Sequence, residues 1–403
     1  MVNKILLILL LSVACASASP TPRHSSFKAT LMRPASPIRL KDVYRRDMKR
    51  WAKFDTNSFS IPAINEDVSY TITVGLGTPV TNVSLIFDTG SSNLWVKSTA
   101  YNPLNSRTAN YLGETFSIQY GSGNASGKEY TDVASLGCYK FTQEFGVSSN
   151  FSGFSSTVQG LVGFGPDDLS TNVTSTGEKV LTPVDNLYST HQISSNVIGV
   201  WFQPITNGGI QETNGEITFG GHDSTKYYGK ITYVPITTAS PASEYWGIDI
   251  AEIAFGTTKV TSTIHGIVDT GTTLILLSSA ATSSLYEQIP GAKVDNDTTL
   301  YIIPPAEVPK LKDITFNIGH RVFVLTPAQY TVPQNQVANI GGKVGTTYSW
   351  ISSLGDNESG LAFILGQKFL ENFYSVYDTT HKRVGLARAV KATCKKRQGR
   401  ARF

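Results

Sequence analysis

The chain has 403 residues, 40% of them hydrophobic and 16% charged, which is enough to bury two separate cores. Three cysteines exclude a fold held mainly by disulfides. The net charge of +4 hides three regions: residues 19–56 hold ten basic and three acidic residues, residues 57–387 hold 16 basic and 27 acidic, and residues 388–403 hold seven basic and none acidic. An acidic body between a basic leader and a basic tail argues against a nucleic-acid-binding protein.

Residues 1–18 are typical of a signal peptide. Lys4 precedes an aliphatic run over 5–11, and the small residues at 14–19 fit a cleavage site. A run of about ten apolar residues is too short for the ~20 that span a bilayer, and no later stretch is longer, so we expect no transmembrane segment. We expect secretion to the extracellular space, with an acidic vacuole as the alternative. Cys138, in a strand-like run, and Cys394 then either pair or remain thiols.

Residues 19–56 are interpreted as a basic pro-segment. The stretch 40–54 is amphipathic, and strand-like alternation begins only at 61–64. We expect this leader to act as an intramolecular inhibitor that covers an acidic cleft until protonation of carboxylates weakens the attraction. The alternative is a solvated leader with no inhibitory role.

The body of the chain is predicted to be all-β. Alternating patterns predict strands at 70–74, 217–219, 231–234 and 248–250, and 35 glycines punctuate the rest. Short helices are expected at 183–190, 279–288, 305–311 and 367–372. We place an N-terminal lobe at 57–232, a C-terminal lobe at 233–388 and a basic tail at 389–403.

A duplicated pattern supports the two lobes. Asp88 and Asp269 each end an apolar run and begin Asp-Thr-Gly followed by two hydroxyl residues. Each acid is preceded by a related segment, at 70–79 and 245–257, and followed by an apolar-apolar-Gly triplet, at 161–163 and 364–366. From average residue usage, a single Asp-Thr-Gly is expected by chance in roughly one chain in ten of this length. Two copies in matching contexts are much harder to attribute to chance. The pattern predicts a strand that delivers a carboxylate into a tight turn, once from each lobe.

These motifs resemble those of the pepsin-like aspartic proteases, most closely fungal secreted enzymes of the polyporopepsin type. The resemblance covers about residues 57–388. It rests on DTGSSNLWV at 88–96, QYGSGNASG at 119–127, FGGHDSTKYYGKITYVPI at 219–236, IVDTGTT at 267–273 and FILGQKFLENFYSVYD at 363–378. It implies a bilobal fold of two related β-barrel-like lobes with the active-site cleft between them.

The resemblance also implies an aspartate dyad. Peptide hydrolysis by water needs a base for the nucleophile and an acid for the carbonyl oxygen and leaving nitrogen. As is characteristic of aspartic proteases, two carboxylates about 3 Å apart share one proton. Asp88 and Asp269 match the catalytic pair, and sequence does not assign which one carries the proton. The residues that match the supports of the two turns are Thr89, Gly90, Ser91, Thr270, Gly271 and Thr272.

A substrate-covering hairpin, the flap, is implied by the same resemblance. Tyr120, Gly121 and Ser122 match its tip, and Trp95 matches the hydrogen-bonded partner of the tyrosine. Because Ser122 stands where some family members have an acid, we expect a preference for bulky hydrophobic residues around the cut. Aromatic and aliphatic residues expected to line the cleft are Phe151, Phe154 and Leu161.

Other functions have weaker support. The chain has no HExxH and no GxSxG motif, so a zinc peptidase or a serine hydrolase has no support, and we expect no metal and no cofactor. We expect a pepstatin-sensitive monomer that acts on polypeptides. The sequons at Asn82, Asn124, Asn150, Asn172, Asn296 and Asn357 fit a secreted glycoprotein. The alternatives are a catalytically inactive pepsin-like binding protein and a secreted lectin-like or cell-wall protein.

Overall fold

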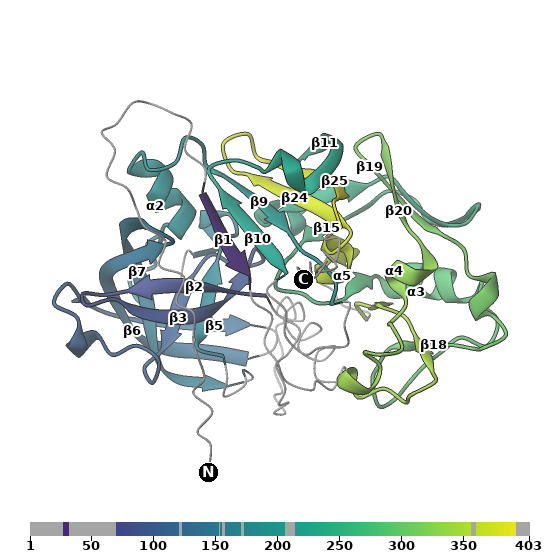
Figure 1. The fold of residues 1–403 in the computed structure, drawn as a ribbon, viewed down its shortest axis with the longest axis horizontal. Coiled ribbons are helices and arrows are strands. Elements are labelled where there is room, and N and C mark those ends of the chain that lie inside the picture. Colours follow the sequence, from purple (N-terminus) through teal and green to yellow (C-terminus); the bar gives the residue numbers. More distant parts are fainter. Residues whose placement is uncertain are drawn as a thin grey trace, which may run out of the picture.

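The computed structural model describes residues 70–120, 123–152, 154, 158–170, 173–205, 214–355 and 360–391, and the backbone of 27–31. Its strands form two lobes that flank a shared sheet (Figure 1). The predicted all-β, bilobal pepsin-like fold is confirmed. Several predicted features lie outside the described residues: the signal peptide, the leader except 27–31, the tail beyond 391, and the residues Gly121, Ser122, Asn172 and Asn357.

The N-terminal lobe is one sheet of seven strands in the order β2-β3-β8-β4-β7-β6-β5. A further pairing of β2 with β6 bends the sheet back on itself, which gives the lobe its barrel-like form. Tyr101, Phe145 and Leu85 are among the side chains buried inside. The strands are β2 Thr71–Leu76, β3 Thr81–Asp88, β4 Leu94–Lys97, β5 Asn110–Tyr120, β6 Gly123–Leu136, β7 Tyr139–Ser152 and β8 Gly160–Gly163.

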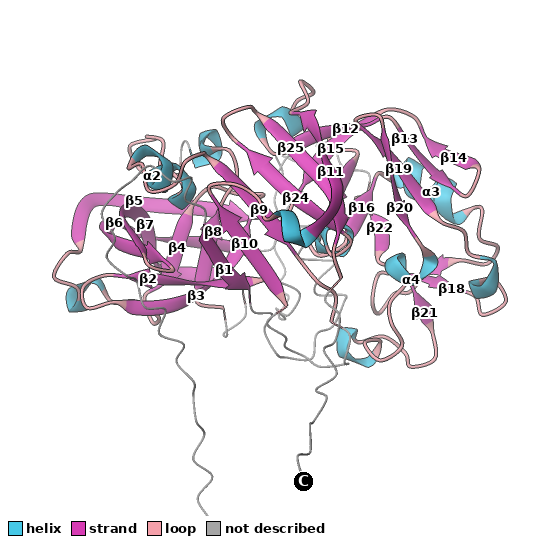
Figure 2. Ribbon diagram, turned by 45° about the horizontal axis from the view of Figure 1, so that its top comes forward, coloured by secondary structure: helices cyan, strands magenta, loops and turns pink. Residues whose placement is uncertain are grey.

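Three smaller sheets make up the C-terminal lobe (Figure 2). Alternation decides which faces are buried: Ile314, Phe316 and Ile318 point into the core from β19. The first sheet holds β12 Gly247–Ile250, β15 Ile264–Val268, β16 Ile275–Leu277, β22 Ile351–Ser353 and β23 Phe363–Leu365. The others hold β13 Glu252–Phe255, β14 Thr258–Thr261, β19 Ile314–Ile318 and β20 Arg321–Leu325, and β17 Lys293–Val294, β18 Tyr301–Ile303 and β21 Thr347–Tyr348.

A six-stranded sheet joins the lobes, in the order β1-β10-β9-β24-β25-β11. Its outermost strand, β1, comes from the basic leader and pairs antiparallel with β10, with Phe27 opposite Phe219 and Leu31 opposite Gly215. The predicted lobe boundary falls within β11. These strands are β1 Phe27–Leu31, β9 Val197–Trp201, β10 Gly215–Phe219, β11 Tyr227–Pro235, β24 Phe373–Asp378 and β25 Arg383–Ala389.

Three of the four expected helices are present, as α2 Pro183–Ser189, α3 Ser279–Tyr286 and α5 Gln367–Leu370. The helix expected at 305–311 is wrong: only the 3-10 turn Val308–Lys310 forms, because Pro309 has no backbone donor for a longer helix. A fourth helix, α4 Pro327–Tyr330, was not predicted. Cys138 lies in the exposed turn between β6 and β7 and not in a strand, since Gly137 adopts a φ of 60°.

Candidate active site

Both aspartates of the duplicated motif are placed at the end of buried strands. Asp88 ends β3 and Asp269 directly follows β15, and both are 0% exposed. Each of these strands pairs in parallel with the strand that carries the apolar-apolar-Gly triplet of its own lobe: β3 with β8 and β15 with β23. The sequence repeat therefore corresponds to a structural repeat.

The two carboxylates have the same hydrogen-bond partners. The amide of Gly90 donates to Oδ1 of Asp88 over 2.9 Å, and the hydroxyl of Ser91 donates to its Oδ2. At the second aspartate the amide of Gly271 donates to Oδ1 over 2.9 Å, and the hydroxyl of Thr272 donates to Oδ2. Donors of this kind stabilise an ionised carboxylate.

Two threonines lock the turns to each other across the lobes. The amide of Thr89 donates to Oγ1 of Thr270 over 2.9 Å, and the amide of Thr270 donates to Oγ1 of Thr89 over 3.0 Å. The hydroxyl of Thr89 in turn donates to the carbonyl oxygen of Val268, and the hydroxyl of Thr270 donates to that of Phe87. Since all these groups are buried, breaking one contact would leave polar atoms without a partner.

The glycine of each triplet lies directly against the backbone of an Asp-Thr-Gly turn. A Cβ on Gly163 would lie 2.6 Å from the carbonyl oxygen of Ser91, and one on Gly366 would lie 2.5 Å from that of Thr272. These contacts are with backbone, which cannot move aside without moving the turn. Glycine is therefore required at both places for a steric reason.

Gly163→Ala should destabilise the protein by about 1–3 kcal/mol, because the added methyl group must push the Ser91 turn outward. Gly221→Ala is the matched control, since a Cβ there meets nothing within 4 Å. Urea unfolding of both variants checks this, and equal stability of the two would contradict it.

The aromatic residues expected at the flap are brought together. Tyr120 ends β5 opposite Gly123 of β6, and its hydroxyl accepts a hydrogen bond from Nε1 of Trp95 over 2.9 Å. The ring of Phe154 lies edge-on to Trp95 at 5.1 Å and to Tyr120 at 5.6 Å. Leu161 is buried in this cluster, whereas Phe151 is 38% exposed with the ammonium of Lys97 over its ring.

Sequence reasoning missed Trp246, which connects the two turns. Its indole donates to the carbonyl of Phe164 in the other lobe over 2.9 Å, and the amide of Phe164 donates to the carbonyl of Asp88. Its own carbonyl accepts from the amide of Val268, next to Asp269. Tyr70 occupies the equivalent place in the first lobe, accepting from the amide of Phe87. The repeat of 70–79 in 245–257 was the signal that could have found it.

Tyr377 was also missed, and it lies beneath the threonine pair. Its hydroxyl is near Ser375 and Thr89 but makes no hydrogen bond of good geometry with a described residue. Burial raises the pKa of Tyr377, and Asp269 and Asp88 raise it further. Its hydroxyl therefore stays neutral at every acidic pH.

The comparisons with known proteins agree with this geometry. The family model of eukaryotic aspartyl proteases matches residues 69–389. The chain belongs to the eukaryotic aspartyl protease family. Polyporopepsin of Irpex lacteus is 44% identical over 333 residues, which cover 81% of this chain and 96% of that protein, and cathepsin E of Mus musculus is 30% identical over 411 residues, covering 96% and 98%. The crystal structure of an aspartic proteinase from Irpex lacteus superposes with a TM-score of 0.79 at 38% identity, covering 92% of this chain and 99% of that one.

As a pepsin-like aspartic protease, the chain is an endopeptidase that acts on polypeptides. Among the described residues no group of three His, Cys, Asp or Glu side chains is placed to hold a metal ion. None of the described helices is long and apolar enough to cross a membrane.

Proposed function

We propose that Asp88 and Asp269 activate a water molecule for peptide hydrolysis, and that the chain is made as a secreted, acid-activated zymogen. The observation that carries the catalytic part is the matched pair of turns: each buried carboxylate accepts one backbone amide and one hydroxyl, and the turns are locked by reciprocal threonine bonds. The fold thus holds two acids in equivalent surroundings.

In this mechanism one aspartate is ionised and the other protonated. The ionised aspartate takes a proton from the water as its oxygen bonds to the carbonyl carbon, while the protonated aspartate donates to the carbonyl oxygen. The first aspartate, now protonated, gives its proton to the leaving nitrogen as the C–N bond breaks. The second aspartate takes back a proton from a hydroxyl of the tetrahedral intermediate, which becomes the carboxyl product. Ser91 and Thr272, with the two glycine amides, stabilise whichever carboxylate carries the charge.

Cleavage of denatured globin at about pH 3–5, with and without pepstatin, tests this function. Pepstatin-sensitive cleavage is expected after acid treatment. A correctly folded sample that cleaves nothing, or that cleaves equally well with pepstatin, would contradict the proposal and favour the inactive binding protein.

We also assign Tyr120 and Trp95 to a flap over the substrate, whose tip at Gly121 and Ser122 lies outside the described residues. The contact of Phe154 with both rings and the burial of Leu161 beside them support a preference for bulky hydrophobic residues at the cut.

Tyr120→Phe should lower kcat/KM about three- to tenfold, because the indole N–H of Trp95 loses its acceptor and the ring of residue 120 is no longer held in place by that bond. Steady-state cleavage of a chromogenic peptide measures this. Tyr188→Phe, on the exposed side of α2, should change nothing. An unchanged kcat/KM in Tyr120→Phe would remove the tyrosine from the proposed flap.

The zymogen proposal is supported by β1. Five residues of the basic leader complete the sheet that joins both lobes, pairing along the whole of β10. The strand β1 thus fixes one part of the leader at the sheet that joins the lobes, and the ten basic residues of the leader suit an acidic body.

A chain of residues 57–403 should be active as soon as it is brought to acid, whereas the full chain should show a lag during which the leader is removed. Activity against time after a drop from neutral pH to about pH 3, with N-terminal sequencing of the product, measures this. The same latency in both chains would show that the leader does not inhibit.

A further inference from the structure

A groove between the lobes contains neither aspartate and takes no part in the proposed mechanism. It has a volume of about 580 Å³, within the ~300–1,000 Å³ of small-molecule sites. One wall is formed by residues 166–169 and Lys179 of the N-terminal lobe. The other is formed by residues 243–246, with Lys382 from the turn between β24 and β25. A ligand there would contact both lobes.

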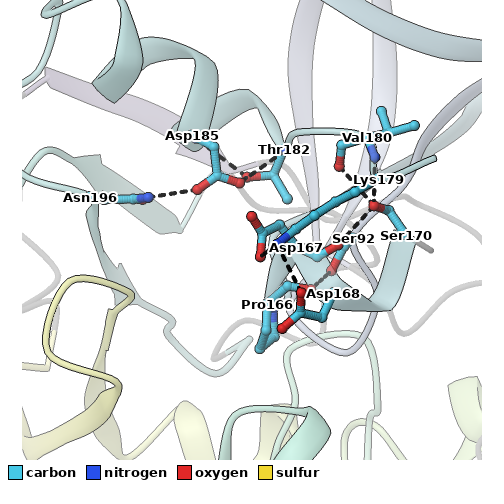
Figure 3. Close-up of polar contacts among 10 residues, drawn as sticks. All are labelled: Ser92, Pro166, Asp167, Asp168, Ser170, Lys179, Val180, Thr182, Asp185 and Asn196. Carbon is cyan, nitrogen blue, oxygen red and sulfur yellow. Dashed lines mark hydrogen bonds and ion pairs between the residues drawn. The ribbon is translucent and has the colours of Figure 1, made fainter.

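The charges on the first wall are already paired. The ammonium of Lys179 lies 2.7 Å from Oδ1 of Asp167 and 2.8 Å from Oδ1 of Asp168, and Figure 3 shows the side chain reaching to both. The same loop is held to the first catalytic turn, because the hydroxyl of Ser92 donates to the carbonyl of Pro166 over 2.6 Å. This wall is therefore fixed in place.

The charges on the second wall are available. Lys382 and Glu244 are both exposed, and neither forms an ion pair or a side-chain hydrogen bond with any residue that the structure describes. The groove thus presents one ammonium and one carboxylate that have no partner within the described ranges.

The same groove has an apolar and partly aromatic lining. Trp246 is 3% exposed, its indole is fixed by the bond to the Phe164 carbonyl, and its ring lies edge-on to Tyr377 at 5.4 Å. Leu169 and Ile236 add aliphatic surface. Such a lining suits a bulky apolar side chain, since groups that are already fixed lose little conformational entropy when a ligand binds.

This combination excludes two classes of ligand. A polyanion would face the carboxylates of Asp167, Asp168 and Glu244, and a purely apolar ligand would take Lys382 and Glu244 out of water without a partner. We propose that the groove binds short peptides that have free termini and a bulky apolar side chain. The peptide carboxylate pairs with Lys382, its ammonium with Glu244, and its side chain packs on the apolar lining that Leu169 and Ile236 form beside Trp246.

The inference rests on the proposed function only for the origin of the ligand, because an endopeptidase that cuts beside bulky apolar residues releases such peptides. Its test needs no catalysis. The protein is saturated with pepstatin at about pH 5.5, above the ordinary pKa of free carboxyl groups. The dipeptide Leu-Phe is then added while the indole ¹H–¹⁵N resonance of Trp246 is followed. That resonance is identified among the five tryptophans by its loss in Trp246→Phe.

The Trp246 resonance should shift and saturate with Leu-Phe and stay in place with N-acetyl-Leu-Phe-amide, which has neither terminal charge. Lys382→Gln and Glu244→Gln should each weaken binding about tenfold, the value of one charged hydrogen bond. Lys259→Gln, an exposed lysine on β14, is the matched control and should leave it unchanged.

No shift with Leu-Phe, an equal shift with the capped peptide, or pocket variants that bind Leu-Phe as tightly as the wild type would overturn the inference. If pepstatin does not block cleavage of globin, the proposed function fails, whatever the dipeptide does. If pepstatin blocks cleavage and the Trp246 resonance does not move, only the peptide site fails.

Discussion

Asp88→Asn or Asp269→Asn should each lower kcat for peptide cleavage by at least about 10³-fold, while the protein folds as before. Asparagine fills the same space and its amide oxygen still accepts the Gly90 or Gly271 amide. It can neither take a proton from water nor supply one to the substrate. The loss should therefore appear in the chemical step and not in stability.

Cleavage assays and urea unfolding of the same samples separate these effects. Asp249→Asn is the matched control, because this carboxylate is half exposed and pairs with His265 away from the turns. Substantial pepstatin-sensitive activity in Asp88→Asn would contradict the assignment of the dyad. A variant that fails to fold would contradict the expectation that the substitution leaves stability unchanged.

Glu129→Gln should make the protein much more resistant to unfolding at high pH. Glu129 is 4% exposed and its Oε2 has no hydrogen-bond partner among the described residues. Burial, with the nearby carboxylates of Glu144 and Glu114, raises its pKa from 4.5 to about 8. Burial and the neighbouring glutamates also raise the pKa of Glu144.

The sign of the effect follows from proton binding. Between about pH 4.5 and 8 the folded protein keeps the Glu129 proton and the unfolded chain does not, so raising the pH favours unfolding. The stability lost by pH 8 from this one group is about 3–5 kcal/mol. Glutamine cannot ionise, so the variant should lose much less stability over this range.

Urea unfolding at a series of pH values, in an Asp88→Asn background that prevents self-digestion, measures this difference. Glu287→Gln, on the exposed end of α3, should keep the wild-type pH dependence. A Glu129→Gln variant that loses stability as steeply as the wild type would show that another group controls the alkaline limit.

Local sequence signals predicted most of the fold. The two Asp-Thr-Gly turns and the two apolar-apolar-Gly triplets are short patterns whose residue types are set by local geometry, as the contacts under Gly163 and Gly366 show. Three of the four expected helices are present because helix formation also depends on local sequence signals. The missed helix α4 carries a Thr326 to Gln329 capping box, a signal that was present in the sequence.

The contacts between lobes could not be predicted in this way. The bond from Trp246 to Phe164 joins positions 82 residues apart, and its partner is a backbone carbonyl that any residue would provide. The buried carboxylate of Glu129 likewise looks, in sequence, like an ordinary polar residue on the outer face of a strand. Only the packing of β6 against its neighbours takes it out of water.

The reciprocal bonds between Thr89 and Thr270 have the form of an isologous contact, in which each residue of a pair touches its own counterpart. In proteins made of identical subunits, such contacts lie on a twofold axis. A single chain that reproduces one between its own halves is, at its centre, equivalent to a symmetric dimer with a covalent link. Around that centre the halves differ, since the first forms one closed sheet and the second forms three.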